Sequence, residues 1–186
     1  MPDLTLPTSR LLLRPFREDD FAAVHAYACD PEVCRYMTWG PNTEEETRAF
    51  LAGVIARAGD EPRLEFDWAV TLREGGGLLG GCGLYRDRTA TYRAMLGYCY
   101  HPDHWGHGYA TEAAGAMVDF GFRELGLHRV YAYHAAPNVA SGRVMEKLGM
   151  QYEGCWREAE RHGEEWYDVM AYGILEGEWR ARYSVS

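Results

Sequence analysis

HPDHWGHGYATEA, residues 101–113, combines three histidines at intervals of three (His101, His104 and His107) with two glycines that directly precede an alanine-rich run. Two kinds of site are consistent with this segment. One is a metal site made by the histidine side chains, and the other is an anion site made by the backbone around the glycines. The sequence on either side of the segment discriminates between them.

The segment lies between a predicted strand and a predicted helix. Residues 92–101, YRAMLGYCYH, form a continuous apolar stretch typical of a strand, and the run from Tyr109 to about Glu124 is typical of a helix that ends near Gly126. Glycines allow neighbouring N–H groups to point together, and a helix start adds unsatisfied N–H groups and the positive end of the helix dipole. This arrangement predicts a binding site for phosphate or pyrophosphate.

The same segment disfavours a metal site. Histidines at i, i+3 and i+6 share a face only on a helix, but Pro102, Gly106 and Gly108 disfavour a helix at this place. No glutamate completes an HExxH arrangement. We therefore expect no metal. The alternative to the anion site is a solvent-exposed turn in which the histidines have no function.

The remaining sequence predicts an α/β (α+β) fold. Strands are predicted at 8–16, 65–72, 78–86, 128–135, 152–160 and 166–175, and helices at 18–29, 42–59 and 138–149. The second of these helices can begin at a capping Asn42 or Thr43. Glycines at 75–77, 80, 81 and 83 are followed by a strand, which predicts a hairpin instead of a nucleotide loop. We expect a single domain, 1–186, with one mixed, mostly antiparallel sheet of six to seven strands and helices on both faces.

Composition narrows the class of protein. The 186 residues carry a net charge of −9, which disfavours nucleic acid as a partner and agrees with cationic ligands such as amines. The five cysteines form no CxxC pair, so neither a disulfide framework nor a zinc knuckle is predicted. The absence of a long apolar run and of a basic-then-apolar N-terminus predicts a cytoplasmic protein that does not associate with a membrane.

The segment GYCYHPDHWGHGYATEA (97–113) resembles the acetyl-CoA-binding segment of the GNAT superfamily of N-acyltransferases, whose signature is Q/R-x-x-G-x-G/A. The signature maps onto residues 105–110, with Trp105 in place of the usual Gln or Arg. Two further segments, TSRLLLRPF (8–16) and GLHRVYAYHAAPNVASGRVMEKLGMQYEG (126–154), resemble the RimJ/RimL-like branch, which acetylates protein N-termini.

The resemblance implies a site for acetyl-CoA. In a GNAT-like sheet the fourth and fifth strands, here 92–101 and 128–135, splay apart, and the pantetheine arm pairs with the fourth. The implied pantetheine contacts are the backbone of Tyr98, Cys99 and Tyr100 together with Asn138, which can alternatively be a helix N-cap. The implied pyrophosphate contacts are the backbone of Gly106, His107, Gly108, Tyr109, Ala110 and Thr111.

The resemblance also implies catalytic residues. Met145 stands where many members carry an acid tyrosine, and Tyr133 stands where some carry a glutamate base. Similarity to the RimL-like pattern implies that Ser141 binds or protonates the CoA thiolate and that Glu160 accepts the amine proton. A helix-start hydroxyl and a solvated carboxylate are the structural alternatives for these two residues.

Two other residues carry side chains able to act in catalysis. His134 is a further possible base. Cys99 has no visible activating partner, so direct transfer is favoured over an acetyl-cysteine.

We expect the acceptor to be a protein or peptide N-terminal α-amine. The alternatives are a small amine, such as a polyamine or an aminoglycoside-like compound, or a non-catalytic CoA-binding module. A homodimer is compatible with the resemblance. The acceptor pocket is expected to be lined by the first two helices and the last hairpin. Trp39, Trp156 and Trp166 are candidates for its lining, but packing into the core is the expected role, because aromatic side chains are usually buried.

Overall fold

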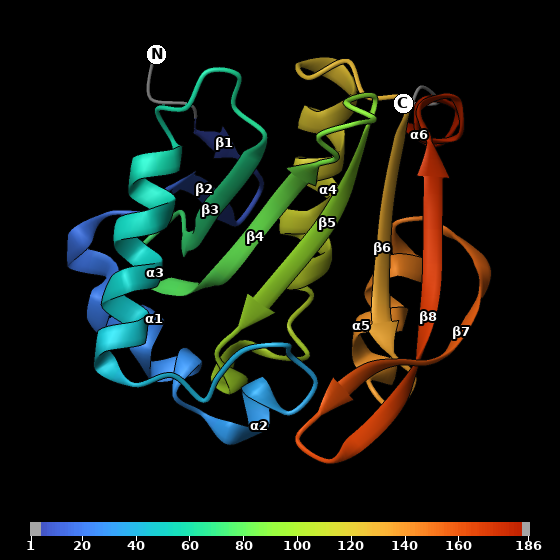
Figure 1. Cartoon of the computed structure of the whole chain (residues 1–186). Helices are drawn as coiled ribbons and strands as arrows, with labels where there is room; N and C mark the ends of the chain where they lie inside the picture. Colours follow the sequence, from blue (N-terminus) through green and yellow to red (C-terminus); the bar gives the residue numbers. More distant parts are fainter. Residues whose placement is uncertain (1–4, 184–186) are drawn as a thin grey trace.

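The computed structural model describes residues 5–183, in which eight strands form one sheet in the order β1-β2-β3-β4-β5-β6-β8-β7 (Figure 1). The strands are β1 (Leu6–Pro7), β2 (Leu11–Pro15), β3 (Glu65–Leu72), β4 (Leu78–Arg86), β5 (Arg93–Tyr100), β6 (Arg129–Ala135), β7 (Gln151–His162) and β8 (Glu165–Leu175). The helices are α1 (Phe21–Ala28), α2 (Pro31–Cys34), α3 (Glu44–Arg57), α4 (Tyr109–Arg123), α5 (Val139–Lys147) and α6 (Glu176–Tyr183).

The predicted mixed, mostly antiparallel sheet is confirmed. All neighbouring strands are antiparallel except the pair β5–β6. The structure adds the two-residue strand β1, whose Leu6 pairs with Leu13, and the short helices α2 and α6. With two and four residues, β1 and α2 are too short to produce a periodic pattern in the sequence. The cap of α3 is Thr43, whose side chain accepts a hydrogen bond from the backbone N–H of Glu46.

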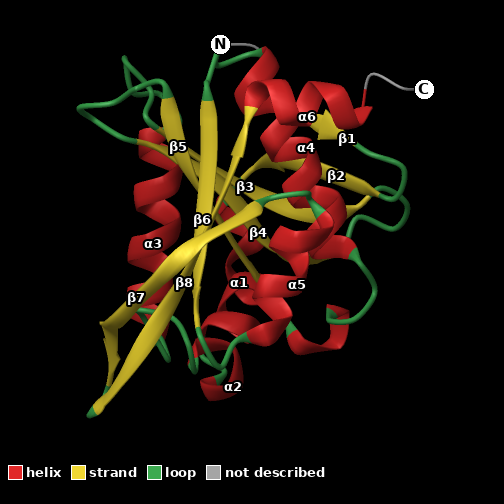
Figure 2. Cartoon of the chain, turned by 90° about the vertical axis from the view of Figure 1, so that its right-hand side faces the viewer, coloured by secondary structure: helices red, strands yellow, loops and turns green. Residues whose placement is uncertain are grey.

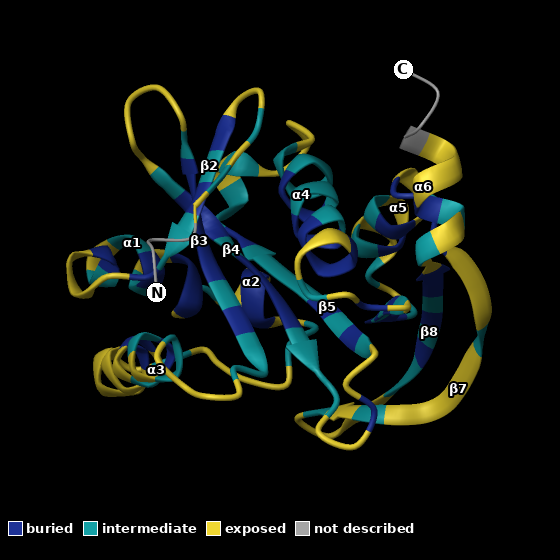
Figure 3. Cartoon of the chain, turned by 90° about the horizontal axis from the view of Figure 1, so that it is seen from above, coloured by how far each residue is buried: buried dark blue, intermediate teal, exposed yellow. Residues whose placement is uncertain are grey.

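Helices cover both faces of the sheet, as predicted. On one face α4 buries Met117 and Val118 against side chains such as Trp68 of β3. On the other face α1 and α3 bury Val24 and Leu51 in a second cluster with Ala69. Side chains alternate along a strand, so Asp67 of β3 shares the face of Ala69. Figure 3 shows the helices on either side of the sheet and the long exposed strand β7 at its edge.

The sheet opens between β5 and β6. The parallel ladder joins only residues 93–95 to residues 129–131, and beyond Met95 the two strands diverge (Figure 1). The expected splay of these strands is therefore confirmed. The N–H of His101 donates to the Leu79 carbonyl at 3.0 Å. Because bonded and non-bonded pairs alternate in an antiparallel ladder, the main chain of Cys99 faces β4, and that of Tyr98 faces the gap.

The hairpin of β7 and β8 projects from the sheet at the same end as α2 (Figure 2). The rings of Tyr36, just after α2, and Tyr167 of β8 meet edge to face with 5.9 Å between centroids. This contact joins the segment after α2 to the hairpin. Among residues 5–183, no helix has the length and apolar character required to cross a membrane.

Candidate active site

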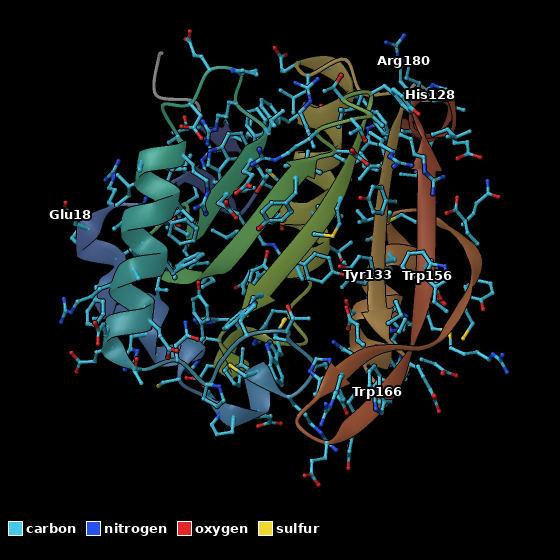
Figure 4. The ribbon with its side chains drawn as sticks, viewed as in Figure 1. Glu18, His128, Tyr133, Trp156, Trp166 and Arg180 are labelled. Atoms are coloured by element: carbon cyan, nitrogen blue, oxygen red, sulfur yellow. The ribbon has the colours of Figure 1, made fainter. Side chains whose placement is uncertain are left out.

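A pocket of about 560 Å³ lies where β5 and β6 diverge. Its walls come from α1, α3, the segment 36–39, β3 to β6, α5 and Glu160 of β7. These walls include residues of the first two predicted helices and of the last hairpin, where the acceptor pocket is predicted. The prediction that three tryptophans pack into the core is wrong, because Trp39, Trp156 and Trp166 are 39%, 50% and 56% exposed. Trp39 lines the pocket, and Trp166 lies near the tip of the hairpin (Figure 4).

The turn before α4 has the geometry of an anion site. Gly106 and Gly108 have φ values of +77° and +79°, a left-handed conformation that disfavours other residues. Gly108 caps α4 without a side chain, so no capping group covers the first-turn N–H groups of Tyr109, Ala110 and Thr111. A Cβ added at Gly106 would meet nothing within 4 Å. Open space, exposed N–H groups and the helix dipole fit the pyrophosphate of CoA.

The side chains of this turn do not make a metal site. His101 caps a short 3₁₀ turn by accepting a hydrogen bond from the N–H of Asp103 at 3.3 Å. Across the described part of the chain, no three His, Cys, Asp or Glu side chains form a group able to hold a metal ion. Trp105, which replaces the usual Gln or Arg, donates its indole N–H to the Tyr100 carbonyl at 2.8 Å. The tryptophan thus ties the turn to the end of β5.

Three polar side chains meet at the start of α5, all of them in the pocket lining. Asn138 caps the helix by accepting from the backbone N–H of Ser141 at 3.3 Å. The Tyr98 hydroxyl lies 2.9 Å from Ser141 Oγ and donates to the Ser141 carbonyl at 3.0 Å. Burial raises the pKa of Tyr98, so the phenol stays protonated. Sequence reasoning missed this side chain, because the two residues are 43 positions apart.

The other groups on this wall are fixed by packing. Met145 is buried and lines the pocket. His134 holds Nδ1 2.8 Å from the Ala135 carbonyl, and a Cβ at Gly142 would approach its Nε2 to 2.7 Å. The ring also stacks on Tyr172. These contacts favour a structural role for His134.

Glu160 reaches the pocket through an irregularity in β7. Trp156 pairs with Val169 and Glu160 pairs with Tyr167, so β7 has three residues where β8 has one. Glu158, inside this bulge, has φ +48°, and its N–H donates to Asp168 Oδ1 at 2.8 Å. Bulges re-aim the side chains that follow them. The Glu160 side chain is only 16% exposed, which disfavours the solvated alternative.

The neighbours of Glu160 are aromatic. Tyr133 of β6 also lines the pocket, and its ring lies 5.9 Å from that of Trp156 (Figure 4). Burial and the nearby Glu160 charge raise the pKa of Tyr133. His162 Nε2 lies 3.5 Å from Glu160 Oε2. Glu160 therefore lies in a mostly buried, largely aromatic part of the pocket.

Cys99 lines the pocket but is a poor nucleophile. Burial raises the pKa of its thiol to about 12, and the Cys34 thiol adds to this rise. The thiolate required for covalent catalysis is therefore almost unpopulated at neutral pH. This agrees with direct transfer.

A splayed parallel pair of strands, a left-handed glycine turn before a helix and a pocket between them define an acyltransferase fold with a place for a CoA thioester. The sequence model of the acetyltransferase (GNAT) domain matches residues 10–151. The chain therefore belongs to the GNAT acetyltransferase family and is an acetyl-CoA-dependent N-acetyltransferase.

Individual relatives agree with this assignment. The N-acetyltransferase YnaD of Bacillus subtilis is 37% identical over 94% of this chain and 98% of its own length. The crystal structure of a GNAT-family acetyltransferase from Bacillus anthracis superposes with a TM-score of 0.84 at 35% identity, covering 94% of this chain and all of that one. The ribosomal L7/L12 α-N-protein acetyltransferase RimL in complex with coenzyme A shares the fold, with a TM-score of 0.82 at 20% identity over 92% and 98% of the two chains.

Proposed function

We propose that this enzyme transfers the acetyl group of acetyl-CoA by direct attack of a primary amine, and that the acceptor is a protein or peptide N-terminal α-amine. The observation that carries the proposal is the pocket itself. Glu160 and Ser141 both line it, beside the part of β5 that has no partner on β6.

Main-chain groups hold and polarise the thioester in this proposal. Leu96 and Tyr98 direct their N–H and carbonyl groups into the gap, where a pantetheine arm can pair with them as an added strand. The main chain of Cys99 faces β4 instead of the gap, and the Tyr100 carbonyl already accepts a hydrogen bond from Trp105. Leu96 and Tyr98 are therefore favoured over Cys99 and Tyr100 as partners of the pantetheine arm. An N–H of this edge stabilises the oxyanion. The amide nitrogen of Asn138 supports the arm while its oxygen caps α5.

Side chains move the protons. Glu160 takes the proton of the attacking amine, and the Ser141 hydroxyl donates a hydrogen bond to the departing thiolate. A serine hydroxyl is a weak acid, so a second donor strengthens the arrangement. When the single Tyr98 phenol hydrogen turns from the Ser141 carbonyl to Ser141 Oγ, 2.9 Å away, it makes the serine hydrogen a better donor through a cooperative chain.

The chemistry of the acceptor supports an α-amine. An α-amine has a pKa of about 7.7–8.0, against about 10.4 for lysine. A single carboxylate can therefore deprotonate it near neutral pH without further activation. The RimJ/RimL-like segments and the shared fold of RimL add to this argument.

A small cationic amine is the second candidate. The pocket lining contains a second carboxylate, Asp67 of β3, in addition to Glu160. Aromatic side chains such as Phe16, Phe50 and Trp39 also line the pocket. An aliphatic diamine could use both the carboxylates and the aromatic surface.

Release of CoA thiol from acetyl-CoA, measured with a panel of N-terminal peptides, polyamines and aminoglycosides, tests the proposal, and product mass identifies the acetylated nitrogen. We expect turnover with peptide α-amines and a loss of about 100-fold in kcat for Glu160→Gln, with CoA affinity unchanged. Glu164→Gln, in the exposed hairpin turn, is the matched control. Tight CoA binding without turnover on any amine would refute the proposal.

A further inference from the structure

The pocket contains a second pair of polar side chains that the transfer chemistry does not use. Asp67 of β3 and Tyr85 of β4 both line it, and the Tyr85 hydroxyl donates to Asp67 Oδ1 at 2.5 Å. The direct cross-strand partner of Asp67 is Gly83, so the tyrosine leans back along its strand to reach the carboxylate. The Asp67 side chain is only 9% exposed.

Two glycines make room for this pair. A Cβ at Gly83 would lie 2.8 Å from Tyr85 Oη and 3.1 Å from Asp67 Oδ1. A Cβ at Gly97 would lie 3.2 Å from Tyr85 Cε2. Neither glycine has a positive φ, so space rather than backbone conformation requires them. Without these side chains the tyrosine ring can lie flat across β4 and β5.

The Tyr85 ring borders the gap between β5 and β6, where the proposed function places the thioester. Gly97 belongs to the part of β5 beyond the ladder to β6, between the gap-facing main chains of Leu96 and Tyr98. A ring that rests on Gly97 therefore extends from Asp67 toward the reacting end of the pocket.

The hydrogen bond leaves the tyrosine oxygen able to accept. The phenol hydrogen points to Asp67, and the oxygen lone pairs remain for a donor from the pocket. Two guanidinium groups lie near Asp67: Arg57, whose Nη2 is 3.8 Å away, and Arg63. The Glu65 carboxylate, which pairs with Arg57 at 2.7 Å, offsets part of this positive charge. The pair is thus an acceptor with negative character.

Resting on the proposed function, we propose that Tyr85 and Asp67 bind the acceptor amine: the Tyr85 oxygen accepts an N–H hydrogen bond from the acceptor nitrogen, and Asp67 positions the tyrosine. Because this hydrogen bond uses an N–H of the acceptor, the nitrogen lone pair points away from Tyr85 and toward the gap between β5 and β6. Tyr85 touches the substrate, whereas Asp67 acts through Tyr85 as a positioning residue.

Equilibrium binding tests the pair without relying on turnover. The protein loaded with CoA is titrated by calorimetry with tetra-alanine carrying a free N-terminus, with spermidine, and with N-acetylated tetra-alanine as a ligand control. We expect Tyr85→Phe to weaken binding of the free amines about tenfold, the effect of one lost hydrogen bond. Asp67→Ala, which removes the acceptor that positions Tyr85, should weaken it by a similar factor, and the double variant by little more, because both residues act on one contact.

Two controls separate this role from a structural one. Affinity for CoA should not change in Tyr85→Phe, and Tyr92→Phe, an exposed tyrosine outside the pocket, should bind the amines as the wild type does. The proposal falls if Tyr85→Phe binds them with wild-type affinity, or if the CoA-loaded wild type binds neither amine. Acetyl-CoA turnover in the same samples distinguishes the two proposals. Turnover unaffected by Tyr85→Phe leaves the proposed function standing, and Tyr85-dependent binding without turnover leaves only the amine site.

Discussion

Glu112, on the first turn of α4, accepts hydrogen bonds from both the backbone N–H and the side chain of Arg10, at 2.8 and 2.7 Å. The hydroxyls of Thr8 and Ser9 donate to the same carboxylate. Arg10 also donates to the His107 carbonyl at 3.0 Å and lies over the ring of Tyr109. The segment before β2 therefore clamps the glycine turn that is expected to hold pyrophosphate.

This clamp predicts a specific dependence of stability on pH. Burial alone would raise the pKa of Glu112, but hydrogen bonds from Thr8, Arg10 and Ser9 outweigh burial and lower it to about 2. A lowered carboxyl pKa stabilises the fold above the unfolded pKa of about 4.5, and this contribution is lost as the pH falls toward 2. We expect Glu112→Gln to lower the free energy of unfolding at pH 7 by about 2 kcal/mol, after discounting for solvent screening.

Denaturant unfolding between pH 7 and pH 2.5 measures this effect. The difference between wild type and Glu112→Gln should shrink as the pH falls, whereas Glu164→Gln should follow the wild type throughout. A constant difference across this range would show that the carboxylate charge does not contribute in this way.

The glycine turn can be tested with a matched pair of substitutions. Gly106 and Gly126 have φ values of +77° and +63°, and a Cβ at either would meet nothing within 4 Å. Alanine should therefore cost each site about 1 kcal/mol of stability through backbone strain alone. Only Gly106→Ala should also weaken CoA binding, by about tenfold, because it disturbs the N–H groups of the turn. Calorimetric titration with CoA makes the comparison, and equal CoA affinities in the two variants would contradict the assignment of the turn.

Local patterns made this turn predictable from sequence. Gly106 and Gly108 stand between an apolar strand and an alanine-rich helix, and both adopt the left-handed conformation that only glycine accepts readily. The Thr43 cap was likewise marked by the acidic residues after it. The glycine turn and the helix cap depend on residues that are neighbours in the chain, so residue types and their spacing are enough to predict them.

Contacts between distant segments were not predictable in the same way. Arg10 and Glu112 are 102 residues apart, and Tyr85 and Asp67 meet only because one hairpin sets them diagonally. The prediction of a buried Trp156 is wrong because aromatic character predicts burial only on average, whereas β7, which carries Trp156, lies at the sheet edge. Register and edge position follow from the complete fold, so a single sequence did not reveal them.

The contact of Tyr98 with Ser141 predicts a graded loss of catalysis. Ser141→Ala should lower kcat about tenfold, because the thiolate loses its hydrogen-bond donor. Tyr98→Phe should lower kcat only a few-fold, because the tyrosine acts through the serine. The double variant should match Ser141→Ala, a non-additivity that steady-state kinetics of all four proteins can measure. Independent, additive losses would place Tyr98 in a separate role.

Asp168 provides a test of how Glu160 is positioned. Its Oδ1 accepts the N–H of Glu158 at 2.8 Å and holds the bulge that turns Glu160 into the pocket. We expect Asp168→Ala to lower kcat by ten- to a hundredfold, the effect of a base displaced by about 1 Å. Asp168→Asn keeps an oxygen that can accept this hydrogen bond, so it should retain most of the activity.

Affinity for CoA should be unchanged in both Asp168 variants, since neither touches the turn before α4. Asp60→Ala, in the exposed loop after α3, controls for loss of a surface carboxylate. If Asp168→Asn is as slow as Asp168→Ala, the charge of Asp168 acts directly on the reaction, because the bulge would then be intact in a slow enzyme. If both variants are as fast as the wild type, the bulge holds Glu160 without this hydrogen bond, through the pairing of β7 with β8 alone.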